Sequence, residues 1–460
     1  MYLENWLHKI IKNALENEAE FRSFANKGSP DRLTRSDVEM YQVFRLNQTL
    51  QYAFERSSFY RERFRKTGIA PDDILNLSHL PELPFTEPQD LAEAPYRFLC
   101  ISQAEIARPY TFVTSGTTGP QKKIFWTHRD LEHIIDFMAA GIGTVATDND
   151  VVQIMLPDGR PYSQADLLHR GVKKYGATPV LASVDLDAQE QLKIIEQHHS
   201  TVVFGYVSPL FRLSKELETK EDLSSKGVRV LFLAAEYLPE VRRQELERIW
   251  NCRVHTHYGL TEMGLGVAVE CEARNGYHFN EADLLLEIIN PQTGEVVAAG
   301  EEGELVFTTL TRQAMPLIRY RTHDISRLIV EPCLCGAESL LKLDKVRKRL
   351  ESIVFIGDGD LLYPTLFDDV LFGIPGLIDY QLVVLREQGK DHLHFKIEMI
   401  SGHENVIPEI KKRLLLSPLI AKNIATGKMM EPTVDIAGWG SLKSTHRTKK
   451  LIIDRRIAAD

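Results

Sequence analysis

The sequence has little of what marks secreted, membrane-spanning or nucleic-acid-binding proteins. Its five cysteines in 460 residues are few and odd in number, which argues against a disulfide framework and favours the reducing cytoplasm. Charged side chains at Glu4, Lys9 and Lys12 interrupt any signal peptide, and no apolar run is long enough for a transmembrane helix. A formal net charge of −9 argues against a general binder of nucleic acid or membrane surfaces.

The remaining composition is typical of a globular enzyme with more than one domain. The hydrophobic fraction is 43% and the charged fraction is 26%, both ordinary for such proteins. The chain is long enough for about two or three domains and a large core. We find no internal repeat and no low-complexity segment.

The hydrophobic pattern predicts a helical segment followed by an α/β region. Apolar residues recur at helical spacing through residues 1–66, which predicts an N-terminal helical layer. Between residues 151 and 250, apolar runs alternate with amphipathic segments, and this alternation predicts a parallel sheet covered on both faces. The expected strands are Val151–Leu156, Thr178–Ala182, Thr201–Phe204 and Val228–Ala234. The expected helices are Ala165–Tyr175, Ala188–His198, Ser208–Glu218 and Val241–Trp250.

The pattern changes at Gly276, where antiparallel strands become the expectation. His278–Ile289, Gly303–Thr309 and Leu317–Arg321 have the composition of strands separated by turns, which predicts a β subdomain. Beyond Lys345 the elements are smaller and of mixed type. We therefore predict an α/β protein with an N-terminal helical layer (1–66), an α/β domain with a β subdomain from about residue 276 (67–345) and a small mobile α+β C-terminal domain (346–460).

A loop at residues 114–123, Thr-Ser-Gly-Thr-Thr-Gly-Pro-Gln-Lys-Lys, precedes a predicted strand and helix. Hydroxyl groups and backbone N–H groups in such a turn form a cradle for phosphate, and glycine lets the backbone approach the phosphate oxygens. The Walker pattern is not matched, because Gln121 stands five residues after Gly116. Taken alone, a loop of this composition is more often a plain connection than a nucleotide site.

Two further motifs lie downstream of the loop. Tyr258-Gly259-Leu260-Thr261-Glu262 combines an aromatic ring that can stack on a base with a hydroxyl for phosphate and a carboxylate for Mg²⁺. The segment 319–324, Arg-Tyr-Arg-Thr-His-Asp, ends in an acidic residue that suits ribose hydroxyls. The structural alternative, an arginine–aspartate surface pair, is the more common explanation for such a segment in isolation.

Together, and in this order, the three motifs resemble the adenylate-forming superfamily of acyl-CoA synthetases, and within it the phenylacetate-CoA ligase branch. Further stretches that share the resemblance are Ser58-Phe59-Tyr60, Leu83-Pro84-Phe85-Thr86, Glu270-Cys271, Gly276-Tyr277-His278, the strand and turn at 303–311 and Cys333-Leu334-Cys335-Gly336. The resemblance covers roughly residues 55–390. It implies an acyl-CoA synthetase-like fold in which the site lies between the large domain and a lid that rotates.

The resemblance also implies the reaction and its partners. A carboxylate, an aryl or arylacetic acid by analogy, attacks the α-phosphate of ATP with the help of Mg²⁺, and coenzyme A then attacks the acyl-adenylate. Relatives that only adenylate, or that have lost catalysis, are the alternatives. The implied partners are the small carboxylic acid and CoA, with no nucleic acid and no membrane, and a homodimer is left open.

The family's roles carry over to individual positions of this sequence. The residues expected to hold the β- and γ-phosphates are Ser115, Thr117, Thr118 and Lys122. Gly116, Gly119 and Arg349 are further candidates for binding the nucleotide. The residues expected to line the adenine pocket are Ala235, Glu236, Tyr258 and Gly259. Thr261 is expected at the α-phosphate, Glu262 on Mg²⁺ and Asp324 on the ribose hydroxyls. The candidates for the acyl pocket are Leu156-Pro157-Asp158-Gly159, Gly205-Tyr206 and Gly264.

The C-terminal part departs from the family pattern at two places. At the hinge, Lys348-Arg349-Leu350-Glu351-Ser352 keeps the arginine, Arg349, but lacks the glycine and has glutamate in place of aspartate. In the tail, an ungapped match puts Thr448 at the position of the catalytic lysine, with Lys449 next to it. A shift of one residue brings Lys449 into the site, so Lys449 is our candidate, with Lys443 and Lys450 as the alternatives.

Three cysteines and one histidine suggest a structural zinc site. They are Cys271, His278, Cys333 and Cys335. Thiolates and an imidazole are the preferred ligands of tetrahedral Zn²⁺, and Gly336 permits the tight turn that two neighbouring ligands need. Plain burial of the cysteines is the competing explanation, His278 could instead belong to the core or the acyl pocket, and His257 is the alternative fourth ligand.

Overall fold

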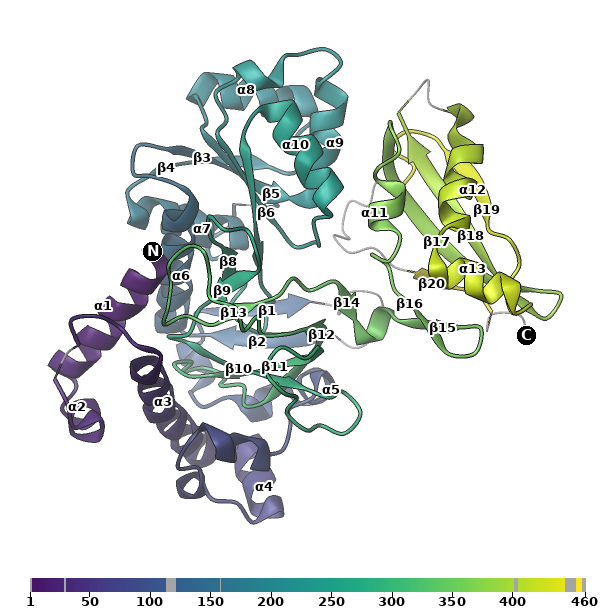
Figure 1. Ribbon diagram of the computed structural model, residues 1–460. Helices are drawn as coiled ribbons and strands as arrows, with labels where there is room; N and C mark the ends of the chain where they lie inside the picture. Colours follow the sequence, from purple (N-terminus) through teal and green to yellow (C-terminus); the bar gives the residue numbers. More distant parts are fainter. Residues whose placement is uncertain are drawn as a thin grey trace.

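The structure is a computed structural model that describes residues 2–28, 30–112, 121–157, 159–400, 404–442 and 452–456. Four helices at the N-terminus lie along one side of the molecule (Figure 1). Their buried residues, such as Leu7, Phe21 and Leu50, belong to the same apolar core as the large domain. These helices are α1 (Tyr2–Asn17), α2 (Ala19–Ala25), α3 (Arg35–Arg56) and α4 (Ser58–Thr67).

The segment after α4 leads over the surface into the glycine-rich loop. It contains α5 (Pro88–Glu93) and four short 3₁₀ turns, at Pro71–Asp73, Leu77–Glu82, Pro95–Phe98 and Gln103–Glu105. A two-stranded antiparallel hairpin then joins β1 (Arg108–Phe112) to β2 (Lys122–Trp126). Because Phe112 pairs with Lys122, the two strands bracket residues 113–121 and fix where that loop leaves and rejoins the fold.

An eight-stranded sheet forms the centre of the large domain, in the order β13-β9-β8-β7-β6-β5-β3-β4. Strands β3 to β7 are parallel to one another, and β8, β9 and β13 continue the sheet in antiparallel fashion. The parallel strands are β3 (Val151–Leu156), β4 (Thr178–Ser183), β5 (Val202–Tyr206), β6 (Val230–Ala234) and β7 (Arg253–Tyr258). The antiparallel ones are β8 (Ala268–Glu270), β9 (Tyr277–Phe279) and β13 (Lys342–Leu343).

Helices cover both faces of this sheet, as the alternating pattern predicts. Side chains of a strand alternate between faces, so Phe204 and Phe232 join the core beneath one pair of helices, while Val203 and Leu231 join the core beneath three others. The first face carries α6 (His128–Val145) and α7 (Gln164–Tyr175). The second carries α8 (Ala188–His198), α9 (Val207–Leu217) and α10 (Glu240–Trp250).

A second sheet of four antiparallel strands, in the order β10-β11-β12-β14, lies beside the large one (Figure 1). Its strands are β10 (Leu284–Ile289), β11 (Gly303–Thr309), β12 (Tyr320–Ser326) and β14 (Lys348–Arg349). The prediction of one strand over 278–289 was wrong, because Asn280 and Asp283 form a hydrogen-bonded turn that separates β9 from β10. The third strand begins at Tyr320 rather than Leu317, since Arg319 has the left-handed φ of 47°, which interrupts extended backbone.

The C-terminal part folds around its own apolar core, which contains Leu382, Phe395 and Ile410. Its main sheet has the order β19-β18-β17-β20, and a small hairpin, β15 (Val354–Ile356) with β16 (Asp360–Leu362), precedes it. The sheet strands are β17 (Leu377–Glu387), β18 (Lys390–Met399), β19 (Thr433–Ala437) and β20 (Ile452–Asp454). The helices are α11 (Asp368–Leu371), α12 (Ile407–Leu415) and α13 (Pro418–Ala425).

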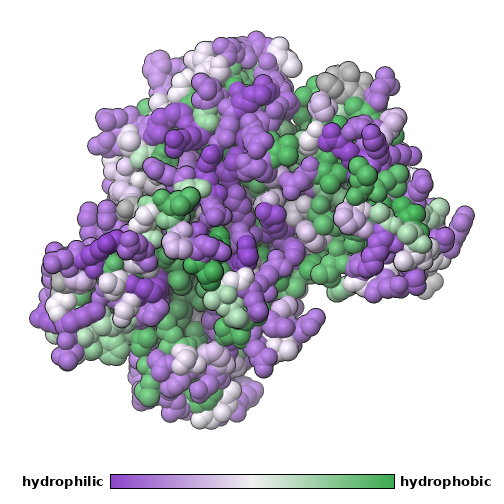
Figure 2. Space-filling view, viewed as in Figure 1, coloured by the Kyte–Doolittle hydropathy of each residue, from purple (hydrophilic) through white to green (hydrophobic). Residues whose placement is uncertain are grey.

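The small domain lies against one side of the large one, beside α9 and α10 (Figure 1). In the same view the surface over α8 to α10 is mostly hydrophilic, whereas apolar side chains gather on the small domain (Figure 2). Among the described residues, none of the helices combines the length and the apolar character needed to cross a membrane.

Candidate active site

A pocket opens between the two domains at the carboxyl ends of β6 and β7. This is the edge at which parallel sheets bind ligands. Ala235 directly follows β6 and has a left-handed φ of 72°, which turns the chain away from the strand. The small domain closes the pocket from the other side. The lining includes Ala235, Glu236, Tyr237, Arg242, His257, Tyr258, Gly259, Leu260, Tyr277, Asp324, Arg349, Thr365 and Asp368.

Asp324 is the acidic centre of this pocket. The Tyr258 hydroxyl donates to its Oδ2 at 2.7 Å, and the Arg349 guanidinium contacts both carboxylate oxygens, with Nη2 at 3.2 Å from Oδ2. Burial alone would lower the pKa of Arg349, but the ion pair with Asp324 raises it above its ordinary value. The three predicted residues therefore come together, from β7, β12 and the hinge strand β14.

A second cluster joins the glycine-rich loop to the 258–262 motif. Lys122 Nζ lies 3.1 Å from Glu262 Oε1 and 2.9 Å from the Tyr320 hydroxyl, which itself donates to Glu262 at 3.0 Å. All three side chains are buried. Burial, together with the Glu262 carboxylate, raises the pKa of Tyr320 well above its ordinary value. A carboxylate that shares its site with a lysine at the base of the loop is suited to phosphates that arrive with a metal ion.

The 258–262 turn depends on a glycine and on a buried arginine. A Cβ at Gly259 would lie 1.6 Å from the Leu265 carbonyl oxygen, so only glycine fits there. Arg312 donates from Nη1 to the Glu262 carbonyl oxygen at 2.5 Å, and its guanidinium lies 4.2 Å from the Trp126 ring centre. Burial lowers the pKa of Arg312 to about 10. These contacts connect the turn to Trp126 of β2 through Arg312.

Glu236 lies on the predicted adenine side of the pocket. Ser208 donates to its carboxylate from both its hydroxyl and its backbone N–H, the latter at 3.3 Å. Burial raises the pKa of Glu236 to about 7, so near neutral pH the carboxyl is present both as acceptor and as proton donor. Such a group can pair with an amino group or a ring nitrogen of a base.

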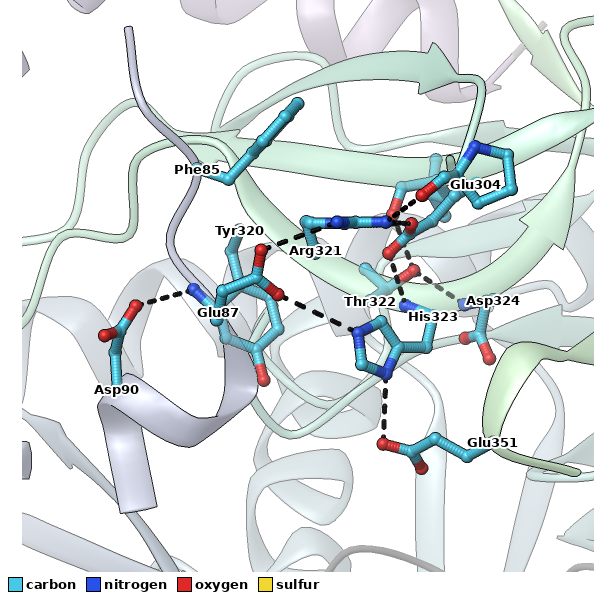
Figure 3. Close-up of polar contacts among 12 residues, drawn as sticks. Phe85, Glu87, Asp90, Glu304, Tyr320, Arg321, Thr322, His323, Asp324 and Glu351 are labelled. Carbon is cyan, nitrogen blue, oxygen red and sulfur yellow. Dashed lines mark hydrogen bonds and ion pairs between the residues drawn. The ribbon is translucent and has the colours of Figure 1, made fainter. Parts of the chain in front are cut away.

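The 319–324 motif has a structural and a functional half, and Figure 3 shows the contacts of its residues Tyr320 to Asp324. Arg319 is buried and forms two hydrogen bonds of 3.0 Å with the Glu287 carboxylate, which anchors the strand. His323 Nδ1 lies 3.0 Å from Glu351 of the hinge, and its Nε2 lies 3.9 Å from Glu87. Burial alone would lower the pKa of His323, but these two carboxylates raise it to about 9. The expected alternative of an exposed arginine–aspartate pair was wrong, because Asp324 is 1% exposed.

An apolar cavity adjoins the interdomain pocket, between α6, α7 and the sheet. His257 contributes to the walls of both, and its ring stacks on Phe204 with ring centres 5.2 Å apart. Burial lowers the pKa of His257 to about 4, so the imidazole is neutral. The other lining residues are Phe137, Met138, Gly141, Ile142, Gln164, Leu168, Phe232, Gly266 and Val269.

Of the described residues that the sequence nominated for the acyl pocket, none lines this cavity. Tyr206 donates to Gln164 at 3.2 Å, and Gly264 lines a separate polar pocket near Trp126 and Arg312. Leu156 and Gly205 lie in neighbouring strands β3 and β5, and Asp158 lies outside the described residues.

The four proposed zinc ligands come together at the edge of the large sheet. Their ligand atoms all lie within 4.8 Å of one another, with Cys271 Sγ 3.5 Å from Cys333 Sγ and Cys335 Sγ 3.4 Å from His278 Nε2. His278 Nδ1 faces the Leu341 carbonyl oxygen at 3.1 Å, an arrangement that leaves Nε2 to bind a metal. His257 lines the interdomain pocket instead, and His278 is the histidine that lies with the three cysteines.

Some predicted residues lie outside the described part of the chain. They are Ser115, Gly116, Thr117, Thr118 and Gly119 of the loop and Lys449 of the tail, together with its alternatives Lys443 and Lys450. Sequence reasoning also missed three residues of the site. Tyr320 lies inside the 319–324 motif, so its place in the site could have been predicted from the sequence. Arg312 and His257 have no local sequence signal for this role and are recognised only from their neighbours in space.

Two family models match the chain: AMP-binding enzyme over residues 100–311 and AMP-binding enzyme C-terminal domain over residues 359–456. The phenylacetate-coenzyme A ligase of Thermus thermophilus is 31% identical over 80% of this chain and 82% of its own length. That of Aromatoleum evansii is 31% identical over 84% and 87%. The chain belongs to the AMP-binding enzymes, in their phenylacetate-CoA ligase branch.

Solved structures confirm the fold of this AMP-binding enzyme. A 2-hydroxyisobutyryl-CoA ligase in the postadenylation state matches with a TM-score of 0.80 at 19% identity, over 93% of this chain and 91% of that one. The same ligase in the thioesterification state gives a TM-score of 0.64 at 20% identity, over 92% and 91%. The two domains here are therefore arranged more as in the first of these states than in the second.

Proposed function

We propose that this protein is an ATP-dependent carboxylate–CoA ligase that acts through an acyl-adenylate on an aryl or arylacetic acid. The observation that carries the proposal is a pair of clusters joined by β12, on which Tyr320 and Asp324 both lie. Asp324 contacts Tyr258 and Arg349, and Tyr320 contacts Lys122 and Glu262. The first suits the ribose of a nucleotide and the second suits its phosphates. The proposed acid and the proposed acceptor, CoA, are taken from the two phenylacetate-coenzyme A ligases described above, each of which is 31% identical in sequence to this chain.

In the first step an oxygen of the carboxylic acid attacks the α-phosphorus of ATP, and the bond to pyrophosphate breaks. Charge develops on the phosphoryl oxygens, so the protein contributes cations and hydrogen-bond donors rather than a nucleophile. Lys122 directly follows the glycine-rich loop, at the start of β2, and we assign the α-phosphate to the hydroxyl of Thr261, the residue that precedes Glu262. The loop residues from Ser115 to Gly119, and Lys449 from the tail, complete the donor set.

The donor chemistry at Glu262 fits Mg²⁺. One buried carboxylate is what a Mg²⁺ site needs when phosphate oxygens and water supply the remaining ligands. Such an ion, when bound, neutralises charge on the phosphates. Glu262 would hold this ion, and Lys122, whose Nζ lies 3.1 Å from the same carboxylate, would supply a second positive charge for the phosphates.

The acyl group enters the apolar cavity between α6, α7 and the sheet. Its walls of Phe204, Phe232 and Met138 suit a flat apolar group, and the neutral His257 ring separates it from the nucleotide. In the second step the CoA thiolate attacks the acyl carbon and AMP leaves. The cytoplasm, where ATP and CoA are abundant, is the proposed compartment.

We also propose that Cys271, His278, Cys333 and Cys335 hold a structural Zn²⁺. Three thiolates and one imidazole within 4.8 Å of one another make a closed tetrahedral set with no open position for a substrate. The cluster ties β8 and β9 to the segment that leads through β13 into the hinge. The metal would therefore stabilise the large domain at the point where the small domain is attached.

The proposed ligase activity is tested by pyrophosphate release with a panel of carboxylic acids, with and without CoA. The expected result is release that depends on an aryl acid, together with an acyl-CoA product when CoA is present. Release without a thioester would indicate an enzyme that only adenylates. ATP binding without any release would show that catalysis has been lost and would overturn the proposal.

A further inference from the structure

A buried ion pair connects the two domains away from the nucleotide. Arg212 of α9 meets Glu398 of β18 with both ends of its guanidinium group, Nη1 on Oε1 and Nη2 at 2.8 Å from Oε2. Glu398 has no exposed surface, and the Arg212 side chain is 12% exposed. Paired, parallel contacts of this kind are the strongest that arginine and carboxylate form.

The same carboxylate also holds the chain that enters the lysine-bearing tail. The backbone N–H of Gly440 donates to Glu398 Oε1 at 2.7 Å, and that of Leu442 donates to Oε2 at 3.1 Å. Leu442 immediately precedes residues 443–451, which include Lys443, Lys449 and Lys450. Each oxygen of Glu398 thus accepts one bond from the large domain and one from the entrance to the tail.

Neighbouring groups reinforce the contact on both sides. Asp379 of β17 lies 3.5 Å from Arg212 Nη2. Arg242 of α10 donates to the Ile378 carbonyl oxygen, and its guanidinium stacks 3.6 Å from the Phe372 ring centre. Helices α9 and α10 of the large domain therefore contact strands β17 and β18 of the small domain through two arginines.

We propose that Glu398 is a positioning residue for the first half-reaction. Its pair with Arg212 holds the small domain against α9, and its bonds to the backbone of Gly440 and Leu442 fix the last described residues before the segment that contains the candidate lysines. Rotation of the small domain for thioester formation would separate Arg212 from Glu398, so the pair acts only in the adenylate-forming arrangement. This inference rests on the proposed ligase function.

The test measures acyl-adenylate formation and thioester formation separately in two variants, Arg212→Met and Glu398→Gln. Loss of a buried charge partner should slow acyl-adenylate formation about tenfold or more. Thioester formation from supplied acyl-adenylate should stay within about twofold of the unchanged protein, since that arrangement does not use the pair. The matched control is Arg35→Met, which breaks the Arg35–Glu281 ion pair inside the large domain. The Glu281 carboxylate, like that of Glu398, has no exposed surface. Arg35→Met should show no such difference between the two half-reactions.

A second readout does not depend on activity. Small-angle X-ray scattering of the ATP-free protein should match the docked arrangement for the unchanged chain and for Arg35→Met. Arg212→Met and Glu398→Gln should shift toward a more extended particle. Equal losses in both half-reactions, or unchanged scattering and unchanged adenylation, would overturn the inference. An unchanged chain that releases no pyrophosphate with any acid, but whose scattering still responds to Arg212→Met, would overturn the proposed function and leave the docking contact standing.

Discussion

The ribose-binding assignment of Asp324 makes a prediction in which affinity and stability can be separated. Asp324→Ala removes the acceptor for two ribose hydroxyls and also removes the carboxylate that pairs with the buried Arg349. The first effect should raise the KM for ATP, and the second should destabilise the fold even without nucleotide. Asp324→Asn keeps one acceptor oxygen and the shape of the side chain, but loses the charge.

The size of each effect follows from the contact that Asp324→Ala removes, with the ribose hydroxyls in one case and with Arg349 in the other. Leaving the ribose hydroxyls without their acceptor costs about 1–3 kcal/mol, which is roughly a ten- to hundredfold rise in KM. Breaking a buried ion pair by removing one partner costs about 3–5 kcal/mol of stability. Removing both partners, in Asp324→Ala with Arg349→Met, leaves no buried charge behind. The double variant should therefore be more stable than either single variant, while its KM for ATP stays high.

The assays are steady-state pyrophosphate release over a range of ATP concentrations and thermal unfolding without nucleotide. The reasoning requires that stability recovers in the double variant and that ATP dependence does not. An ATP dependence that is unchanged in Asp324→Ala would refute the ribose assignment. A double variant less stable than both singles would refute the view that Asp324 and Arg349 compensate each other's charge.

Three further outcomes are expected. Lys122→Met should slow adenylation about a hundredfold, since a cation at the phosphates is lost, whereas Lys123→Met at the neighbouring position should not; equal effects would contradict the assignment. The pKa of His323 is raised to about 9, so protonated His323 should stabilise the fold fully below its unfolded pKa of about 6.5, and this contribution should be lost as pH rises through 9. His323→Gln should flatten this part of the pH–stability profile. An unchanged profile would refute the role of His323. Protein purified without added zinc should hold about one zinc per chain, which Cys335→Ser should lose and Cys100→Ser should keep; less than about a tenth of an equivalent would remove the site.

Much of the fold could be predicted from the sequence because its signals are local. The strand Val151–Leu156 and the helix Ala188–His198 have the predicted bounds, since hydrophobic period and capping residues specify both. Thr127 and Asp130 form a capping box at the start of α6, a signal that lies within four neighbouring residues. The third strand of the β sheet was misplaced because the left-handed backbone at Arg319 depends on its buried pair with Glu287, a contact between distant residues.

The candidate site could likewise be predicted only in part. Motif residues such as Tyr258, Glu262 and Asp324 were nominated in advance, because a motif concentrates the chemistry in a few neighbouring positions. Their mutual contacts, with Lys122 and Arg349, depend on how β2, β7, β12 and β14 meet, which no local pattern encodes. The interdomain pair of Arg212 with Glu398 joins residues 186 positions apart and could be found only in the folded molecule.

The central claim, that a carboxylate attacks the α-phosphate of ATP, is tested most directly with an acid labelled with ¹⁸O in its carboxyl group. The measurement is mass spectrometry of the nucleotide formed by the purified protein with ATP, CoA and labelled phenylacetate. The account predicts AMP that carries one ¹⁸O per turnover, formed together with acyl-CoA. Unlabelled AMP, or ADP with the label in inorganic phosphate, would contradict it.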